Sequence, residues 1–131
     1  MTFIYKPNLY HMENFSFKKL LVWQKAMTFS EKCLDITETI KGHYRLIEQL
    51  EAAAASVPQN IAEGEGRISV KENINYLYIS RGSLYESITV LNLLYYKNLI
   101  SKETLDEQES LALEITKMIS ALISQKRNQI S

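Results

Sequence analysis

The stretch Ala54-Ala55-Ser56-Val57-Pro58-Gln59-Asn60-Ile61-Ala62-Glu63-Gly64 places a proline where the residues on both sides favour a helix. Proline removes one backbone hydrogen bond and clashes with the preceding turn, at a cost of about 3 kcal/mol in a helix interior. The stretch therefore predicts a kinked or newly started helix, in which other groups compensate the backbone atoms that Pro58 leaves without a partner.

Apolar residues around this stretch recur with helical spacing. A first helix is predicted to begin at Ser16 and to end at Gly42. The stretch from Ala54 to Gly64 belongs to a second helix, which begins near Leu46 and ends at Gly64 and Gly66. The first helix has a wide apolar face, made by Val22, Ala26, Phe29, Cys33, Ile36 and Ile40, with Leu20, Trp23, Met27 and Leu34 beside them.

Helix caps mark two further helices. Ser69 and Glu72 have the spacing of a capping box, which starts a third helix that ends near Asn98. Ser101 is suited to cap a fourth helix, and Arg127 suits its C-terminal end. Between these ends the apolar residues keep the three-four spacing of a helix, and no segment shows the alternation typical of a strand.

Four helices of similar length, joined by connections of a few residues, predict an all-α fold. We expect an antiparallel up-down-up-down four-helix bundle over residues 16–128. Residues 1–15 show no sustained period and are predicted to form an N-terminal arm. The 131 residues are enough for one hydrophobic core and too few for two ordinary domains.

The composition bounds the function classes. Lys and Arg balance Asp and Glu at 15 each, so no overall basic field draws the chain toward nucleic acid, and such binding needs a local patch. The single cysteine, Cys33, cannot form an intrachain disulfide. No apolar run reaches 18 residues. These features predict a cytoplasmic protein without a membrane partner.

Arg81 interrupts the apolar stripe of the third helix. A charged residue in such a position is rarely buried unless it is paired. We predict a structural polar cluster of Asn60, Glu63, Arg81 and Ser83 that compensates the backbone freed by Pro58, with ligand binding as the alternative role. Gly82 is predicted to mark a close helix crossing, because glycine inside a helix costs about 1 kcal/mol relative to alanine.

Residues that could support catalysis are poorly placed. His11 and His43 fall in the arm and in a turn, and no His or Cys cluster has the spacing of metal ligands. No nucleophile has a base nearby in the sequence. The sequence therefore predicts a protein that is not an enzyme and that uses no cofactor or metal.

Three motifs, on three different predicted helices, resemble the signatures of a known family. They are Leu21-Val22-Trp23-Gln24-Lys25-Ala26, Ser56-Val57-Pro58-Gln59-Asn60-Ile61-Ala62-Glu63-Gly64, and Arg81-Gly82-Ser83-Leu84-Tyr85-Glu86. The family is the four-helix-bundle group named for proteins encoded in 23S rRNA intervening sequences. It is similar in turn to the accessory variability determinant of diversity-generating retroelements, a homopentamer that works beside a reverse transcriptase and its RNA template.

This resemblance implies a homo-oligomer, most simply a pentamer, with a non-catalytic role and contact with RNA, DNA or a reverse transcriptase. Many relatives carry two arginines where this chain has Glu51 and Ala52, which weakens the carry-over of nucleic-acid binding. The remaining basic candidates for nucleic-acid contact are Lys18, Lys19, Lys25, Arg67, Lys71, Lys126 and Arg127. Ordinary solvated helix faces are the alternative interpretation of these residues.

Tyrosines are numerous on the third helix. Tyr78 and Tyr85 lie one heptad apart and are the candidates for an oligomer interface, where a ring buries area and its hydroxyl stays hydrated. Stacking on nucleic-acid bases is the alternative role.

The sequence as a whole predicts a non-enzymatic oligomeric binding or scaffold protein that contacts RNA, DNA or a nucleic-acid enzyme. The alternative is a protein-only assembly factor.

Overall fold

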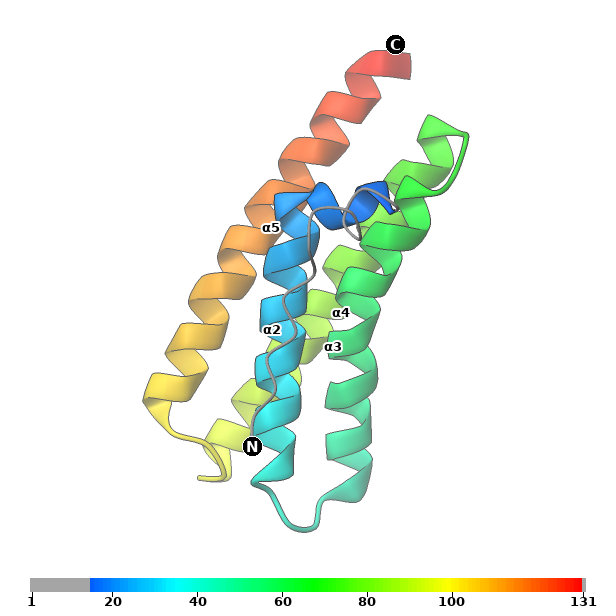
Figure 1. The fold of residues 1–131 in the computed structure, drawn as a ribbon. Coiled ribbons are helices and arrows are strands. Elements are labelled where there is room, and N and C mark those ends of the chain that lie inside the picture. The colour runs from blue at the N-terminus through cyan, green and yellow to red at the C-terminus, as the bar shows by residue number, and fades with distance from the viewer. Residues whose placement is uncertain (1–14, 131) are drawn as a thin grey trace.

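The computed structural model describes residues 15–130. Within them, a short 3-10 helix is followed by four long helices and no strand (Figure 1). The elements are η1 (Ser16–Lys19), α2 (Leu21–Glu38), α3 (Tyr44–Glu65), α4 (Val70–Tyr96) and α5 (Lys102–Ile130). The predicted all-α, antiparallel up-down-up-down four-helix bundle is confirmed. The predicted arm, residues 1–15, lies outside the described residues except for Phe15.

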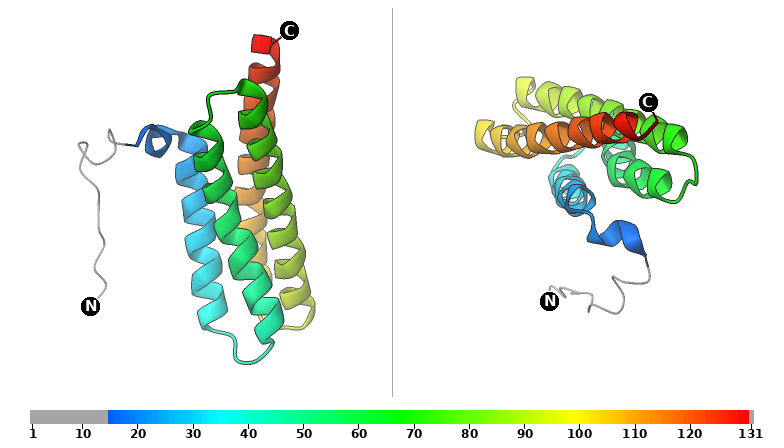
Figure 2. Two further views of the ribbon diagram at one scale, coloured as in Figure 1. Left: turned by 90° about the vertical axis from the view of Figure 1, so that its right-hand side faces the viewer. Right: turned by 90° about the horizontal axis from the view of Figure 1, so that it is seen from above.

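The four long helices form a four-sided bundle. Helix α2 packs against α3 and α5, and α4 packs against the same two helices, with the most extensive contact between α3 and α4 (Figure 2). Each helix contributes large apolar side chains to one core, among them Phe29, Leu50, Leu84 and Ile115, which are fully buried. The bundle interior is therefore closed by side chains.

The first helix begins later than its periodicity predicts. Leu20 is extended, with φ −73° and ψ 123°, and it separates η1 from α2. The ring of Phe17 packs edge-on against Trp23 with centroids 5.2 Å apart, and the Gln24 side-chain amide donates to the carbonyl of Lys18 at 2.7 Å. These contacts turn η1 away from the axis of α2.

The two predicted caps are confirmed. The Ser69 hydroxyl accepts a hydrogen bond from the Glu72 amide at 3.4 Å, and the Ser101 hydroxyl accepts one from the Thr104 amide at 3.1 Å. Helix α2 ends at Glu38, a few residues before the predicted stop at Gly42. Gly42 has φ 80° and lies in the turn that follows, where a side chain would be strained.

Helix α3 ends at Glu65, as predicted from Gly64 and Gly66, but the close helix approach is not at the predicted glycine. Gly64 lies inside α3, and a Cβ atom there would stand 2.8 Å from the Cβ of Tyr76 on α4. Gly82 is exposed, and a Cβ atom there would meet nothing within 4 Å. The close approach of α3 and α4 therefore occurs at Gly64. The prediction that another helix of the same chain packs closely at Gly82 is wrong.

The backbone freed by Pro58 is compensated from α2. In a regular helix the amide of residue 58 would donate to the carbonyl of Ala54, and proline has no such amide. The buried hydroxyl of Ser30 donates to that carbonyl instead, at 2.5 Å. Helix α3 thus continues through Pro58 because a side chain of the neighbouring helix replaces the missing donor.

The structure divides the predicted polar cluster into three parts. Asn60 and Ser83 meet through Ser56, whose hydroxyl is 2.7 Å from the Asn60 amide nitrogen and 2.8 Å from the Ser83 hydroxyl. Glu63 pairs with Arg67 at 2.6 Å. Arg81 is half-buried and donates to Ser120 on α5 at 3.0 Å, because its place on α4 directs it toward α5 and away from Glu63 on α3.

Candidate nucleic-acid interface

The basic residues singled out in the sequence lie at one end of the bundle. Helices α2 and α4 begin at this end, and α3 and α5 finish there (Figure 1). We define the cationic end as residues 15–29, 55–82 and 117–130. These ranges contain the half of each long helix that lies at this end of the bundle. Its nine basic residues are Lys18, Lys19, Lys25, Arg67, Lys71, Arg81, Lys117, Lys126 and Arg127.

The electrically neutral chain is strongly polarised along the bundle. The cationic end holds these nine basic residues and only three acidic ones, Glu63, Glu65 and Glu72. The opposite half, residues 30–54 and 83–116, is the acidic end and holds five basic residues and eleven acidic ones. The local basic patch that a neutral chain needs for nucleic-acid binding is therefore present.

Few cations of the cationic end are neutralised by ion pairs. Lys25 pairs with Glu114 at 2.7 Å, and Arg67 pairs with Glu63 at 2.6 Å. The hydrogen bond that Arg67 donates to the Glu63 carboxylate raises the pKa of Arg67. The Arg67 guanidinium also lies over the ring of Tyr76, 5.0 Å from its centroid. Across residues 15–130 the remaining ion pair, Lys102 with Asp106, belongs to the acidic end. Seven cations thus lack an ion pair within the described chain.

Two of these seven cations meet at one aromatic ring. The guanidinium carbon of Arg81 is 5.0 Å from the ring centroid of Tyr78, and that of Arg127 is 5.4 Å from the same centroid. Arg127 also donates to the Tyr78 hydroxyl. The ring thus holds two positive charges, one from α4 and one from α5, close together.

Tyr85 has different surroundings from Tyr78. Its side chain is 57% exposed and lies beside Leu113 of α5, which is 56% exposed. Further along α4, Leu93 and Tyr96 are also exposed, and the segment 87–96 contains no charged residue. Helix α4 therefore has apolar side chains on its solvent face as well as in the core, as expected of a helix that a partner covers.

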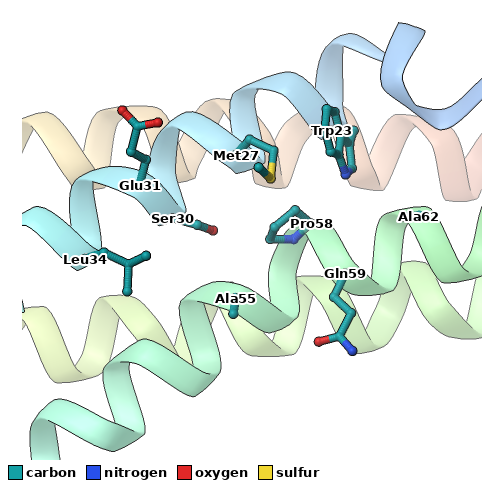
Figure 3. A pocket seen from close by; sticks show the side chains of 9 residues that line it. All are labelled: Trp23, Met27, Ser30, Glu31, Leu34, Ala55, Pro58, Gln59 and Ala62. Carbon is teal, nitrogen blue, oxygen red and sulfur yellow. The ribbon is translucent and has the colours of Figure 1, made fainter. Parts of the chain in front are cut away.

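A shallow apolar groove of about 480 Å³ runs between α2 and α3 (Figure 3). The side chains of Trp23 and Met27 point toward Pro58 across it, and Leu34 closes its other end. Met27 and Leu34 are each 44% exposed, although the periodicity groups them with the buried face of α2. Periodicity missed this groove because it gives the direction of a side chain but not the distance to the next helix.

Glu51 and Ala52 lie at the acidic end. The Thr37 hydroxyl on α2 donates to the Glu51 carboxylate on α3 at 2.8 Å, so Glu51 links the two helices. Ala52 is exposed. The acidic residue at position 51 thus agrees with the charge of this half of the molecule.

The one cysteine is buried in the core. Burial raises the pKa of the Cys33 thiol to about 12, and a hydrogen bond from the Gln108 amide offsets part of that rise. Gln108 also donates to the carbonyl of Phe29 at 3.0 Å.

Between Phe15 and Ile130, no three His, Cys, Asp or Glu side chains form a group that could hold a metal ion. None of the described helices has the length and hydropathy to cross a membrane.

Comparison with known proteins gives a family and a fold. The family model described as "23S rRNA-intervening sequence protein" matches residues 18–121, most of the chain. A crystal structure of a protein of unknown function from the S23 ribosomal protein family of Bacteroides thetaiotaomicron is similar, with a TM-score of 0.73 and 23% sequence identity. The similarity covers 79% of this chain and 98% of that one, and it concerns the fold alone. No curated protein matches the chain.

Proposed function

The chain belongs to the family of 23S rRNA-intervening sequence proteins, and from this premise we propose that it is a non-enzymatic, homo-oligomeric scaffold that binds the phosphates of RNA or DNA. The observation that carries the proposal is the cationic end, where three chain segments bring nine basic residues together. Clustered Lys and Arg neutralise phosphates and release counterions, which supplies affinity without sequence recognition.

Self-association increases this effect. We propose a ring of copies, most simply a pentamer, held by the exposed apolar face of α4 that includes Tyr85. In a ring all subunits present the same end to the same side. The basic patches then add into one continuous surface, so weak contacts from each copy combine into a higher affinity. We place this assembly in the cytoplasm, beside a nucleic-acid enzyme such as a reverse transcriptase.

A protein-only assembly factor is the second candidate function. It is favoured by the apolar face of α4 and by the absence of the two arginines at Glu51 and Ala52. The two functions differ in their response to salt, because phosphate contacts weaken steeply as the salt concentration rises and apolar contacts do not.

Charge-reversal variants test the proposal. We expect Lys18→Glu/Lys19→Glu/Lys126→Glu to lose most binding to RNA and DNA in gel shifts, with a shallower dependence on salt. The matched control Lys32→Glu/Lys41→Glu/Lys97→Glu makes the same charge change at the acidic end and should bind more like the parent. Equal loss in both variants, or no binding by the parent at low salt, would favour the protein-only function.

A further inference from the structure

The surface between α4 and α5 carries a row of residues that can hold an anion. On α4, Tyr78 and Arg81 are three residues apart, and Lys71 lies one heptad before Tyr78. On α5, the residues Lys117, Ser120, Ser124 and Arg127 follow spacings of three and four, which place them on one side of the helix. The hydrogen bond from Arg81 to Ser120 shows that the two rows face each other.

No acidic residue occurs in these two rows. Neither Arg81 nor Arg127 takes part in an ion pair with any residue between Phe15 and Ile130. The guanidinium carbon of Arg81 is 5.0 Å from the Tyr78 ring centroid, and that of Arg127 is 5.4 Å from it. The distance between the two carbons cannot exceed the sum of these two distances. Two like charges within about 10 Å repel each other, and an anion that contacts both lowers that repulsion.

The arrangement is preorganised for such an anion. The ring of Tyr78 attracts both guanidinium groups, its hydroxyl accepts from Arg127, and the Ser120 hydroxyl accepts from Arg81. Each guanidinium has five N–H donors in a planar fork that matches the oxygens of a phosphate. One donor of each fork is used in the described chain, so the others remain for a ligand.

We propose that Arg81 and Arg127, held by Tyr78, clamp one phosphate group of a single-stranded nucleic-acid backbone. The row continues beyond the clamp with Lys71, Lys117 and Ser124, which suits a polymer of phosphates better than a single ion. The identity of the clamp's ligand rests on the proposed function, which is nucleic-acid binding. The clamp goes beyond that function because it assigns one phosphate to named residues of α4 and α5.

The test compares a ten-nucleotide polyuridylate with inorganic phosphate as probes. We expect Arg81→Gln/Arg127→Gln to weaken polyuridylate binding about tenfold in fluorescence anisotropy, and to lower the slope of log affinity against log salt by about 0.7, the value for one phosphate contact on a single strand. The control Arg45→Gln/Lys97→Gln removes the same charge at the acidic end and should leave both values unchanged.

Two single variants keep the test decisive where Arg81→Gln disturbs the bundle. Arg127 is exposed, so Arg127→Gln should fold normally and weaken binding alone. Tyr78→Phe keeps the ring and should bind better than Tyr78→Leu, which removes the support of both guanidinium groups. A merely structural role of Tyr78 would change thermal stability in both variants without this order in binding.

The outcomes separate the clamp from the proposed function. Parent-like polyuridylate binding by Arg81→Gln/Arg127→Gln overturns the clamp, while loss of binding in Lys18→Glu/Lys19→Glu/Lys126→Glu still upholds the cationic end. Loss of inorganic phosphate binding alone assigns the site to free phosphate and overturns the nucleic-acid ligand. A parent protein that binds neither probe contradicts both proposals.

Discussion

At the scale of single residues, the hydrogen bond between Ser30 and Ala54 explains how a helix tolerates Pro58. We expect Ser30→Ala to lower the free energy of unfolding by about 1–3 kcal/mol, because it strands a buried carbonyl oxygen. In the Pro58→Ala background the restored amide can donate to Ala54, so the same substitution should cost clearly less. Urea unfolding of the four proteins of this double-mutant cycle gives the coupling energy.

The control for this cycle is Thr28→Ala, since the Thr28 hydroxyl bonds within its own helix at an exposed position. It should change stability little in either background. Equal effects of Ser30→Ala with and without Pro58 would show that the hydroxyl does not replace the missing amide.

The buried thiol of Cys33 gives a second prediction at this scale. Its pKa of about 12 keeps it protonated, so a thiol reagent at pH 8 should label the folded protein far more slowly than the protein unfolded in guanidinium chloride. Above its ordinary pKa of 9.0 the thiol ionises in the unfolded chain but not in the folded one, so its contribution to stability falls as the pH rises. Labelling of the folded protein at the unfolded rate would contradict this burial.

Sequence reasoning identified Pro58 as a problem but not Ser30 as its solution. Asn60, Glu63, Arg81 and Ser83 were the predicted compensating residues, because Arg81 interrupts an apolar stripe and needs a polar partner, and Asn60 and Glu63 lie near Pro58 in the sequence. Ser30 gave only a weak signal, a polar residue beside the apolar positions Ala26 and Cys33 of the first helix. Which carbonyl it reaches depends on the register of α2 against α3, and periodicity does not give this register.

At the scale of elements, the existence and order of the four helices could be predicted because apolar spacing and caps are local signals. The break at Leu20 could not, since it depends on the contact between Phe17 and Trp23. The close helix approach was expected at Gly82 and occurs at Gly64 for the same reason. Glycine is small wherever it occurs, but only the packing shows which glycine another helix approaches.

These two glycines give a paired prediction. Gly64→Ala should destabilise the fold by about 1–3 kcal/mol, because its Cβ would collide with Tyr76 and overpack the α3–α4 contact. Gly82→Ala should stabilise the single chain by about 0.5–1 kcal/mol, because it adds helix propensity in open space. Urea unfolding measures both, and a stabilising Gly64→Ala would refute the close approach.

At the scale of the whole molecule, the exposed face of α4 gives a test of the proposed assembly. We expect Tyr85→Glu to shift the oligomer toward monomers in multi-angle light scattering, because it places a charge in an apolar contact. Tyr44→Glu is the matched control, since Tyr44 is 79% exposed at the start of α3. An unchanged subunit number in Tyr85→Glu would remove this face from the proposed interface.

The candidate site could be predicted residue by residue but not as a surface. Every basic candidate was recognisable as a cation in the sequence, and the balance of 15 against 15 argued against a basic field. The separation of charge arises only when alternating helices bring Lys18, Arg67 and Arg127 to the same end. The amino-acid composition counts charges without their positions in the fold, so it cannot reveal that positive and negative charges lie at opposite ends of the bundle.

Separated charge also affects the approach to a partner, before any contact forms. A body with no net charge but opposite signs at its two ends is an electric dipole, and near a polyanion it experiences a torque that turns the positive pole forward. Five parallel dipoles in a ring would reinforce one another, whereas an antiparallel stack would cancel them. The direction in which such a ring meets a nucleic acid would thus be set during diffusion, and added salt would remove this bias beyond about 10 Å.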